Sequence, residues 1–168
     1  KSLYDTYHND NDILEAFDKT PYRVLINCLH KGFNRADSLL MKVRPELEAS
    51  EQRCEFIVLD ILDRNENDGS SKLDAKTLFE VAKTDYNVPQ LLPLLKKVSQ
   101  ESDLIYYNED TNELSKMNTY NGECLIADFV KEKLRTSKDN VWDIDWTKYT
   151  KVGDFQLTDT QALALKNV

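Results

Sequence analysis

The chain has 168 residues and a formal net charge of −8, and 31% of its residues are charged. A chain of this length can bury a substantial core in one domain or in two small ones. With only four glycines and four prolines, the composition indicates a soluble, mainly helical protein, and no apolar run is long enough to span a membrane. The acidic balance argues against a protein coated along its length by nucleic acid.

The three cysteines, Cys28, Cys54 and Cys124, lie on predicted apolar helical faces. Their wide spacing favours reduced core thiols over a disulfide framework, a zinc site or a catalytic thiol. No signal-peptide pattern is present, so we expect a cytoplasmic protein. The chain begins without methionine and stops within a helix-like run, which is typical of an excised fragment.

The first predicted elements are short helices. A polar cluster at 9–12 precedes a helical turn whose apolar residues are Ile13, Leu14 and Phe17. Residues 20–28 predict a second helix, with Thr20 as its N-cap and Pro21 at its first position, where the missing N–H costs nothing. The apolar face of this helix consists of Val24, Leu25 and Cys28.

A tight four-residue hairpin follows, in which Gly32 is expected to allow the backbone to turn. We expect Asn34 to cap the next helix, with Asp37 at its third position, where an acid is favourable. Backbone N–H groups at such a helix start point outward and can hold a phosphate. A helical corner in a small bundle is the alternative interpretation of the same residues.

The hairpin lies inside a basic island, residues 19–44, in an otherwise acidic chain. Six basic residues against one acid give the island a charge of +5, so the rest of the chain carries −13. The six are Lys19, Arg23, Lys31, Arg35, Lys42 and Arg44. This asymmetry is typical of a local anion contact, and an ordinary solvated face is the alternative.

Beyond Pro45, which breaks the second helix, the pattern predicts a long amphipathic helix over 51–64 with a core stripe. The stripe consists of Cys54, Ile57, Val58, Ile61 and Leu62. A polar loop at 65–71 leads to a helix capped by Asp74 and ending near Thr84. A further helix is predicted over 90–99, with Pro93 in its first turn.

The hydrophobic period then changes to that of strands. Residues 104–108 and 113–118 resemble two strands joined by a turn at 109–112. Two helices followed by a hairpin is the order of a winged helix-turn-helix module. Its second helix offers only Lys96 and Lys97 to DNA, so packing against protein is the alternative role of this helix.

The last predicted helix spans 120–135 and should bury one apolar stripe, formed by Ile126, Phe129, Val130 and Leu134. The segment 136–155 resembles a linker, but its aromatic residues are too apolar for free solvent. These are Trp142, Trp146 and Tyr149. The spacing of Asp143 and Asp145 could suggest two carboxylate ligands of a metal ion. No other carboxylate or histidine motif supports such a site, so we predict no metal site.

Several short sequence motifs follow one another along the chain in a defined order. They are Thr20-Pro21-Tyr22, His30-Lys31-Gly32-Phe33-Asn34-Arg35-Ala36-Asp37, Arg53, Gly69 to Leu73, Tyr120 with Glu123, and Leu157-Thr158-Asp159-Thr160-Gln161-Ala162. In this order they resemble the region that precedes the motor of RecD-like superfamily-one DNA helicases, including the alpha subunit of exodeoxyribonuclease V. The family motifs are NPY, GIGF-x-x-AD, an arginine that opens the next helix, G-x-x-x-L, a tyrosine-and-glutamate helix start, and L-S-x-x-Q-x-x-A.

The resemblance implies a mainly α fold with three parts. Residues 1–66 would form a helix-hairpin-helix bundle, 67–136 a winged helix-turn-helix-like module with one short β-hairpin and a closing helix, and 137–168 a linker and the start of the motor. His30 departs from the family pattern, because it stands where the family hairpin has its first glycine. The ring could offer an N–H to a phosphate, or it could occupy a turn that has lost the contact.

The function implied by the resemblance is an accessory region that contacts single-stranded or forked DNA without reading its sequence, beside a motor in the same chain. The implied DNA-binding residues are His30, Lys31, Gly32, Asn34 and Arg35, with Lys96 and Lys97 as secondary candidates. ATP and Mg²⁺ would be cofactors of the parent helicase, in which the counterpart of Gln161 recognises adenine. This chain has no G-x-x-x-x-G-K-[ST] loop, so we predict no catalytic residue and no bound cofactor within it.

Two classes of function therefore remain open. The chain is either a DNA-contacting region of a helicase used in recombination and repair, or a structural module that packs on the motor or a partner without touching DNA. The basic island favours the first, and the acidic remainder favours the second.

Overall fold

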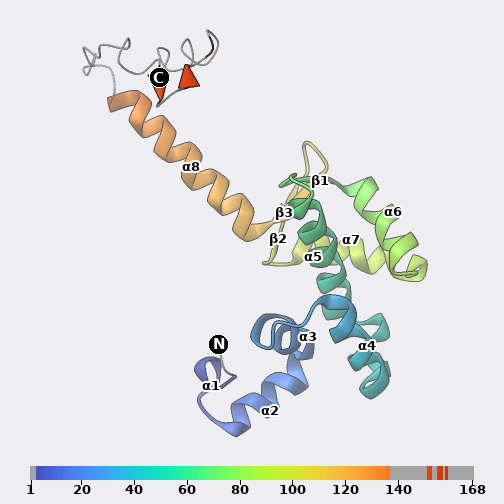
Figure 1. The fold of residues 1–168 in the computed structure, drawn as a ribbon. Coiled ribbons are helices and arrows are strands. Elements are labelled where there is room, and N and C mark those ends of the chain that lie inside the picture. The colour runs from blue at the N-terminus through green and yellow to red at the C-terminus, as the bar shows by residue number, and fades with distance from the viewer. Residues whose placement is uncertain (1–2, 137–150, 153–154, 157, 159–168) are drawn as a thin grey trace. The chain divides into compact units, whose positions relative to one another are not determined.

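The computed structural model describes residues 3–136, 151–152, 155–156 and 158 (Figure 1). The chain divides into two compact units, Lys1–Leu125 and Ile126–Val168. In the second unit, β4 (Lys151–Val152) pairs antiparallel with β5 (Phe155–Gln156). No helix in the described ranges is long and apolar enough to cross a membrane.

The first unit begins with short helices and turns. These are α1 (Leu3–Thr6), α2 (Asp10–Lys19), α3 (Pro21–Arg23), the π-helical turn η1 (Val24–Cys28), α4 (Phe33–Val43) and the 3-10 turn η2 (Pro45–Ala49). The Asn9 side chain begins α2 by accepting a hydrogen bond from the N–H of Asp12 at 3.0 Å. Pro21 occupies the first turn of α3 as predicted. Thr20 does not cap α3 with its side chain, because its hydroxyl donates back to the Ala16 carbonyl of α2 at 3.2 Å.

Helix α5 (Glu51–Asn67) is the central helix of this unit. Ser50 caps it by accepting a hydrogen bond from the N–H of Arg53 at 3.1 Å. The predicted core stripe is confirmed, since Cys54, Ile57, Val58, Ile61 and Leu62 are each at most 3% exposed. Helix α5 packs against α3 and α4 and also against α6, α7 and β3, so one helix supports the hairpin and the elements that follow.

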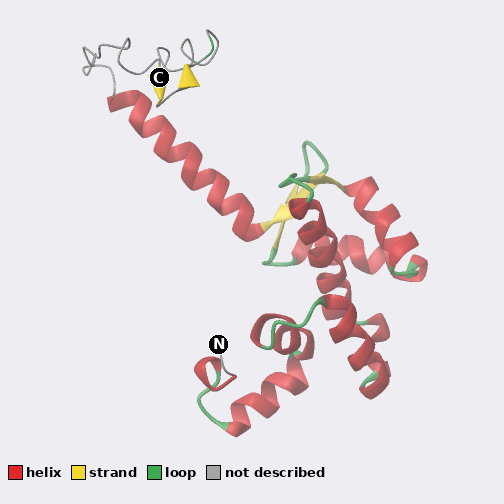
Figure 2. Ribbon diagram, in the orientation of Figure 1, coloured by secondary structure: helices red, strands yellow, loops and turns green. Residues whose placement is uncertain are grey.

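The next elements are arranged as expected for a winged module. They are β1 (Leu73–Asp74), α6 (Ala75–Asp85), the 3-10 turn η3 (Pro89–Leu91), α7 (Leu92–Glu101), β2 (Ile105–Asn108) and β3 (Glu113–Lys116). Strands β2 and β3 form the predicted hairpin, with Ile105 opposite Lys116 and Asn108 opposite Glu113. Strand β1 pairs with the other edge of β3, which gives the order β1-β3-β2. Figure 2 shows the short strands in yellow among helices drawn in red. The mainly α fold with one short hairpin is therefore confirmed.

Two local predictions in this module are also confirmed. The Asp74 carboxylate caps α6 by accepting a hydrogen bond from the N–H of Thr77 at 3.0 Å. Pro93 lies in the first turn of α7, where it displaces no helical hydrogen bond. Strand β1 was not predicted, because two residues are too few to show an alternating pattern.

Helix α8 (Met117–Thr136) begins directly after β3, earlier than predicted, and the Met117 N–H donates to the Leu104 carbonyl at 2.9 Å. The prediction that its apolar stripe is buried was wrong. Ile126, Phe129, Val130 and Leu134 are between 47% and 67% exposed. Helical periodicity shows that these side chains share one face of a helix, but it does not supply an element to cover that face.

Candidate nucleic-acid interface at the helical hairpin

The predicted four-residue hairpin is present between Cys28, where η1 ends, and Phe33, where α4 begins. The Lys31 N–H donates to the Leu25 carbonyl at 3.0 Å and ties the loop back onto η1. A π-helical turn of this kind is uncommon and frequently accompanies a functional site. The loop is therefore a defined structure beside an unusual helical turn.

The residue that turns the backbone is His30 and not Gly32, which corrects the prediction. His30 has φ of 51°, in the left-handed region, whereas Gly32 has φ of −60°, which any residue adopts. A left-handed histidine costs on the order of 1 kcal/mol, and a glycine there would cost little. His30 is therefore the strained position of this loop.

The N-terminus of α4 is formed by Gly32, and the prediction that Asn34 caps it was wrong. The Gly32 carbonyl accepts hydrogen bonds from the N–H groups of Arg35 and Ala36, both at 3.1 Å, which places Asn34 inside the first turn. Gly32, at the N-cap position, has no side chain with which to cap this helix. Its first N–H groups are thus left for solvent or for a ligand, and the helix dipole favours an anion there.

Lys31 and Arg35 are exposed at this helix start, and neither forms an ion pair within the described part of the chain. Two other cations of the island are already paired. Lys19 contacts Glu15, and Arg44 contacts Glu46 at 2.8 Å. Arg23 and Lys42 are also exposed, but they lie outside the loop and the first turn of α4, so the positive charge at the helix start comes from Lys31 and Arg35.

Asp37 does not occupy the third helical position as predicted, because α4 starts at Phe33 and places Asp37 one turn from its first residue. The carboxylate instead receives two hydrogen bonds from Arg53, at 2.8 and 3.0 Å, and one from the hydroxyl of Tyr22. Burial, together with this hydrogen bond, raises the pKa of the Tyr22 hydroxyl well above its ordinary value. The three residues connect α3, α4 and α5.

The Tyr22 ring strengthens the same connection. It stacks between Phe33 and Phe56, with ring centroids 6.1 and 5.8 Å away. The hairpin is consequently anchored on both sides of its loop to the central helix α5. Tyr22, Asp37 and Arg53 therefore have a structural role in this arrangement.

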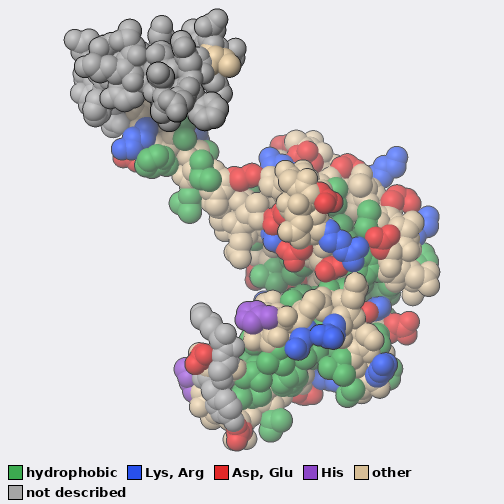
Figure 3. Space-filling model, viewed as in Figure 1, with side chains coloured by type: hydrophobic (Ala, Val, Ile, Leu, Met, Phe, Trp, Pro, Cys, Tyr) green, Lys and Arg blue, Asp and Glu red, His purple; other side chains and the backbone are tan. Residues whose placement is uncertain are grey.

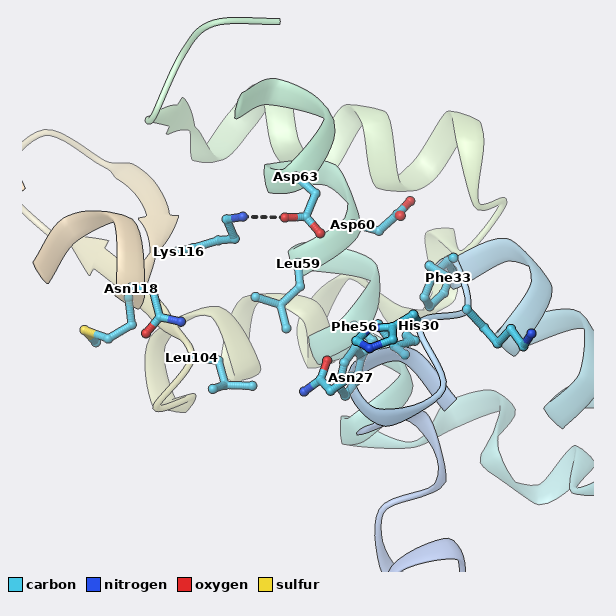
Figure 4. Close-up of a pocket in the computed structure, with 14 residues that line it drawn as sticks. Asn27, His30, Phe33, Phe56, Leu59, Asp60, Asp63, Leu104, Lys116 and Asn118 are labelled. Atoms are coloured by element: carbon cyan, nitrogen blue, oxygen red, sulfur yellow. Dashed lines mark hydrogen bonds and ion pairs between the residues drawn. The ribbon is translucent and has the colours of Figure 1, made fainter. Parts of the chain in front are cut away.

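A pocket of about 470 Å³ opens between the hairpin, one face of α5 and the junction of β3 with α8. Figure 4 shows Asn27 and His30 on one side of this pocket, Leu104 and Asn118 on the other, and Leu59 between them. Lys31, Gly32 and Phe33 also line it, so the pocket adjoins the start of α4. The sequence did not reveal this pocket, because the fold brings together residues that lie far apart in the chain.

The acids of this pocket are paired with bases. Lys116 contacts Asp63, and it also contacts Glu66 at 2.6 Å (Figure 4 shows the Asp63 contact). Asp60 accepts hydrogen bonds from Arg64 at 2.8 Å and from the Tyr86 hydroxyl. The acidic side chains that α5 presents to the pocket are thus close to charge balance.

The secondary candidates Lys96 and Lys97 lie on the exposed face of α7. Lys97 is neutralised, because its ammonium contacts Glu51 at 2.6 Å and Glu101 at 3.7 Å. The hydrogen bond to Glu51 raises the pKa of Lys97. Lys96 forms no ion pair with any described residue, so α7 offers one available cation where the hairpin offers two.

Some predicted features fall outside the described residues. They are Gln161, the pair Asp143 and Asp145, and the aromatic residues Trp142, Trp146 and Tyr149. Within the described ranges, no three histidine, cysteine, aspartate or glutamate side chains gather as a metal site requires. No protein-family model, curated protein or solved structure matches this chain.

Proposed function

We propose that this chain is an accessory DNA-contacting region of an ATP-dependent DNA helicase of the RecD-like type, acting in recombination and repair. The proposal combines the ordered motifs of the sequence with the geometry of the hairpin. The observation that carries it is the start of α4, where an uncapped helix N-terminus and the unpaired cations Lys31 and Arg35 converge. Backbone N–H groups, a helix dipole and two cations are the components of a phosphate contact.

The contact would hold single-stranded or forked DNA near the motor of the same chain without reading its sequence. Phosphate contacts position a nucleic acid but carry no base information. An open approach to the loop supports this role, since a Cβ atom added at Gly32 would meet nothing within 4 Å other than its chain neighbours. A backbone phosphate therefore has room to reach the N–H groups.

The state of the thiols supports the cellular setting that we propose. Cys28, Cys54 and Cys124 are all free, and burial raises the pKa of the Cys54 thiol to about 11. Three unpaired thiols suit a reducing compartment. We accordingly assign the chain to the cytoplasm, with ATP and Mg²⁺ used by the motor of the parent protein.

The direct experiment is a titration of labelled single-stranded and forked DNA with the chain, followed by fluorescence anisotropy. The double variant Lys31→Glu/Arg35→Glu should abolish binding while the far-ultraviolet circular dichroism stays unchanged, because both side chains are exposed. The matched control is Lys72→Glu/Lys76→Glu, which makes the same change in net charge at two exposed lysines outside the basic island and outside α7. Equal loss of binding in both variants would contradict a contact centred on the hairpin.

A second candidate function is supported by exposed apolar surface. Leu14, Leu39 and Val43 are between 50% and 68% exposed around a groove of about 400 Å³ formed by α2, α3 and α4. Figure 3 shows hydrophobic side chains gathered on the N-terminal helices with Lys and Arg beside them. Together with the apolar face of α8, this surface favours a protein-interaction module. Absence of DNA binding by the native chain would favour this second function.

A further inference from the structure

The pocket at the hairpin shares three lining residues, Lys31, Gly32 and Phe33, with the proposed phosphate contact. A ligand held at the start of α4 therefore lies at the mouth of the pocket. In a single strand, each phosphate is joined through its sugar to a base that is free of a pairing partner. A strand whose phosphate lies at α4 can accordingly direct one base into the pocket.

The interior of the pocket suits an uncharged ring better than a second phosphate. Asp60 and Asp63 on α5 are paired with Arg64 and Lys116, so that wall has no excess positive charge to attract an anion. The lining also contains apolar side chains, and they are Ile26, Phe33, Phe56, Leu59, Leu104 and Met117. A volume of about 470 Å³ is within the range of small-molecule sites and accommodates a planar heterocycle.

Two side-chain amides give the pocket the means to bind the edge of a base. Asn27 and Asn118 are exposed and line opposite sides, and neither amide is hydrogen-bonded within the described part of the chain. An amide both donates and accepts, as the edges of all bases do. Any ring in the pocket thus meets hydrogen-bonding groups that need no rearrangement of the fold.

His30 supplies an aromatic ring at the same place. It is exposed, lines the pocket and holds a left-handed backbone conformation that glycine would adopt without strain. Strained residues of this kind cluster at ligand sites, and histidine rings stack on unpaired bases. The ring accounts for a histidine at a position where the backbone alone favours glycine.

We propose that this pocket is a nucleobase subsite, in which one unstacked base of a bound single strand lies against His30 while its phosphate is held at the start of α4. The subsite rests on the proposed function, because the strand must first bind at the hairpin. It adds a base-dependent component to binding that the phosphate contact alone does not have. The occupant is a base of nucleic acid, recognised by its ring and its polar edge.

The test compares a short oligothymidylate with an abasic strand of the same length and backbone, using fluorescence anisotropy. Base–aromatic stacking makes the abasic strand bind roughly tenfold more weakly to the native chain. His30→Gly should bring the two affinities within about twofold of each other, since the stacking partner is removed while the backbone conformation is retained. Lys31→Glu/Arg35→Glu should abolish binding of both strands.

Methyl NMR of the native chain reports on the pocket independently of affinity. Signals from Leu59, Leu104 and Met117 should shift with oligothymidylate and stay in place with the abasic strand. Asn118→Ala, at an exposed position, should weaken oligothymidylate binding and leave abasic binding unchanged.

The possible failures are distinguishable. If the native chain binds both strands equally and the pocket methyl signals do not move, the nucleobase subsite is wrong and the phosphate contact stands. If neither strand binds, the proposed function fails and the subsite fails with it. Pocket methyl signals that shift only with an aromatic peptide would assign the pocket to a protein partner and overturn the subsite.

Discussion

The ion pair formed by Asp37 and Arg53 allows a quantitative test of the structural role of Asp37. The two side chains are 17% and 10% exposed, and the Arg53 Nε lies 2.8 Å from the Asp37 carboxylate. Asp37→Ala leaves the Arg53 guanidinium buried, with the Glu48 carbonyl at 3.1 Å as its remaining acceptor among the described residues. Removing one partner of a buried pair costs about 3–5 kcal/mol, and the partial exposure of this pair places our expectation near 3 kcal/mol.

Urea denaturation followed by circular dichroism measures this loss in the free energy of unfolding. Asp18→Ala is the matched control, because Asp18 forms an exposed pair with Arg44 at 3.5 Å and its removal should leave stability nearly unchanged. DNA affinity of the folded Asp37→Ala variant should equal that of the native chain. A loss of less than about 1 kcal/mol in the free energy of unfolding would refute the structural role, because an exposed ion pair contributes no more than that to stability. Loss of DNA affinity in the folded variant would assign Asp37 to the interface.

Three further predictions concern the hairpin, the tyrosines and the nucleotide. His30→Gly should raise the free energy of unfolding by up to about 1 kcal/mol in urea denaturation, because it relieves the left-handed φ, and a decrease would contradict that strain. The pKa values of Tyr22 and Tyr86 are raised by burial and by hydrogen bonds to carboxylates, so the folded state keeps these protons longer than the unfolded state. Stability should therefore be fully retained below about pH 10 and fall above it, and a double Tyr→Phe variant should show a shallower fall in the same denaturation series. Without a phosphate-binding loop, the chain should neither hydrolyse ATP nor bind it measurably, and micromolar binding in calorimetry would show that the segment around Gln161 is misinterpreted.

Local chemistry explains which parts of the fold could be predicted from the sequence. The α5 stripe, the Asp74 cap and the hairpin over 104–118 depend on side-chain period and on contacts within a few residues. Such signals are present in any short window of sequence. The same holds for Pro21 at the start of α3.

The features that were predicted wrongly depend on geometry that a short window does not contain. Asn34 is a good capping residue, but the chain enters α4 two residues earlier, where the rings of Tyr22 and Tyr86 contact Phe33. Asp37 consequently faces Arg53, sixteen residues away. The apolar pattern of α8 is real, yet no periodicity shows whether such a face is covered.

The pocket at the hairpin is the clearest example of information that only the fold provides. Its lining extends from Ile26 to Asn118, and the acids that line it were unremarkable in the sequence. The candidates Lys31 and Arg35 were identifiable because a basic island stands out in an acidic chain. The sequence could not show that Glu51 neutralises Lys97, because the two residues meet only through the packing of α7 on α5.

The salt dependence of DNA binding tests the phosphate contact at the hairpin most directly. With two to four phosphate contacts at about 0.7 each on a single strand, the logarithm of affinity should fall against the logarithm of salt with a slope of roughly −1.5 to −3. Lys31→Gln should make this slope shallower by about 0.7, while Lys96→Gln leaves it unchanged. An unchanged slope for Lys31→Gln, together with a shallower slope for Lys96→Gln, would place the DNA contact on α7 and contradict a contact at the hairpin.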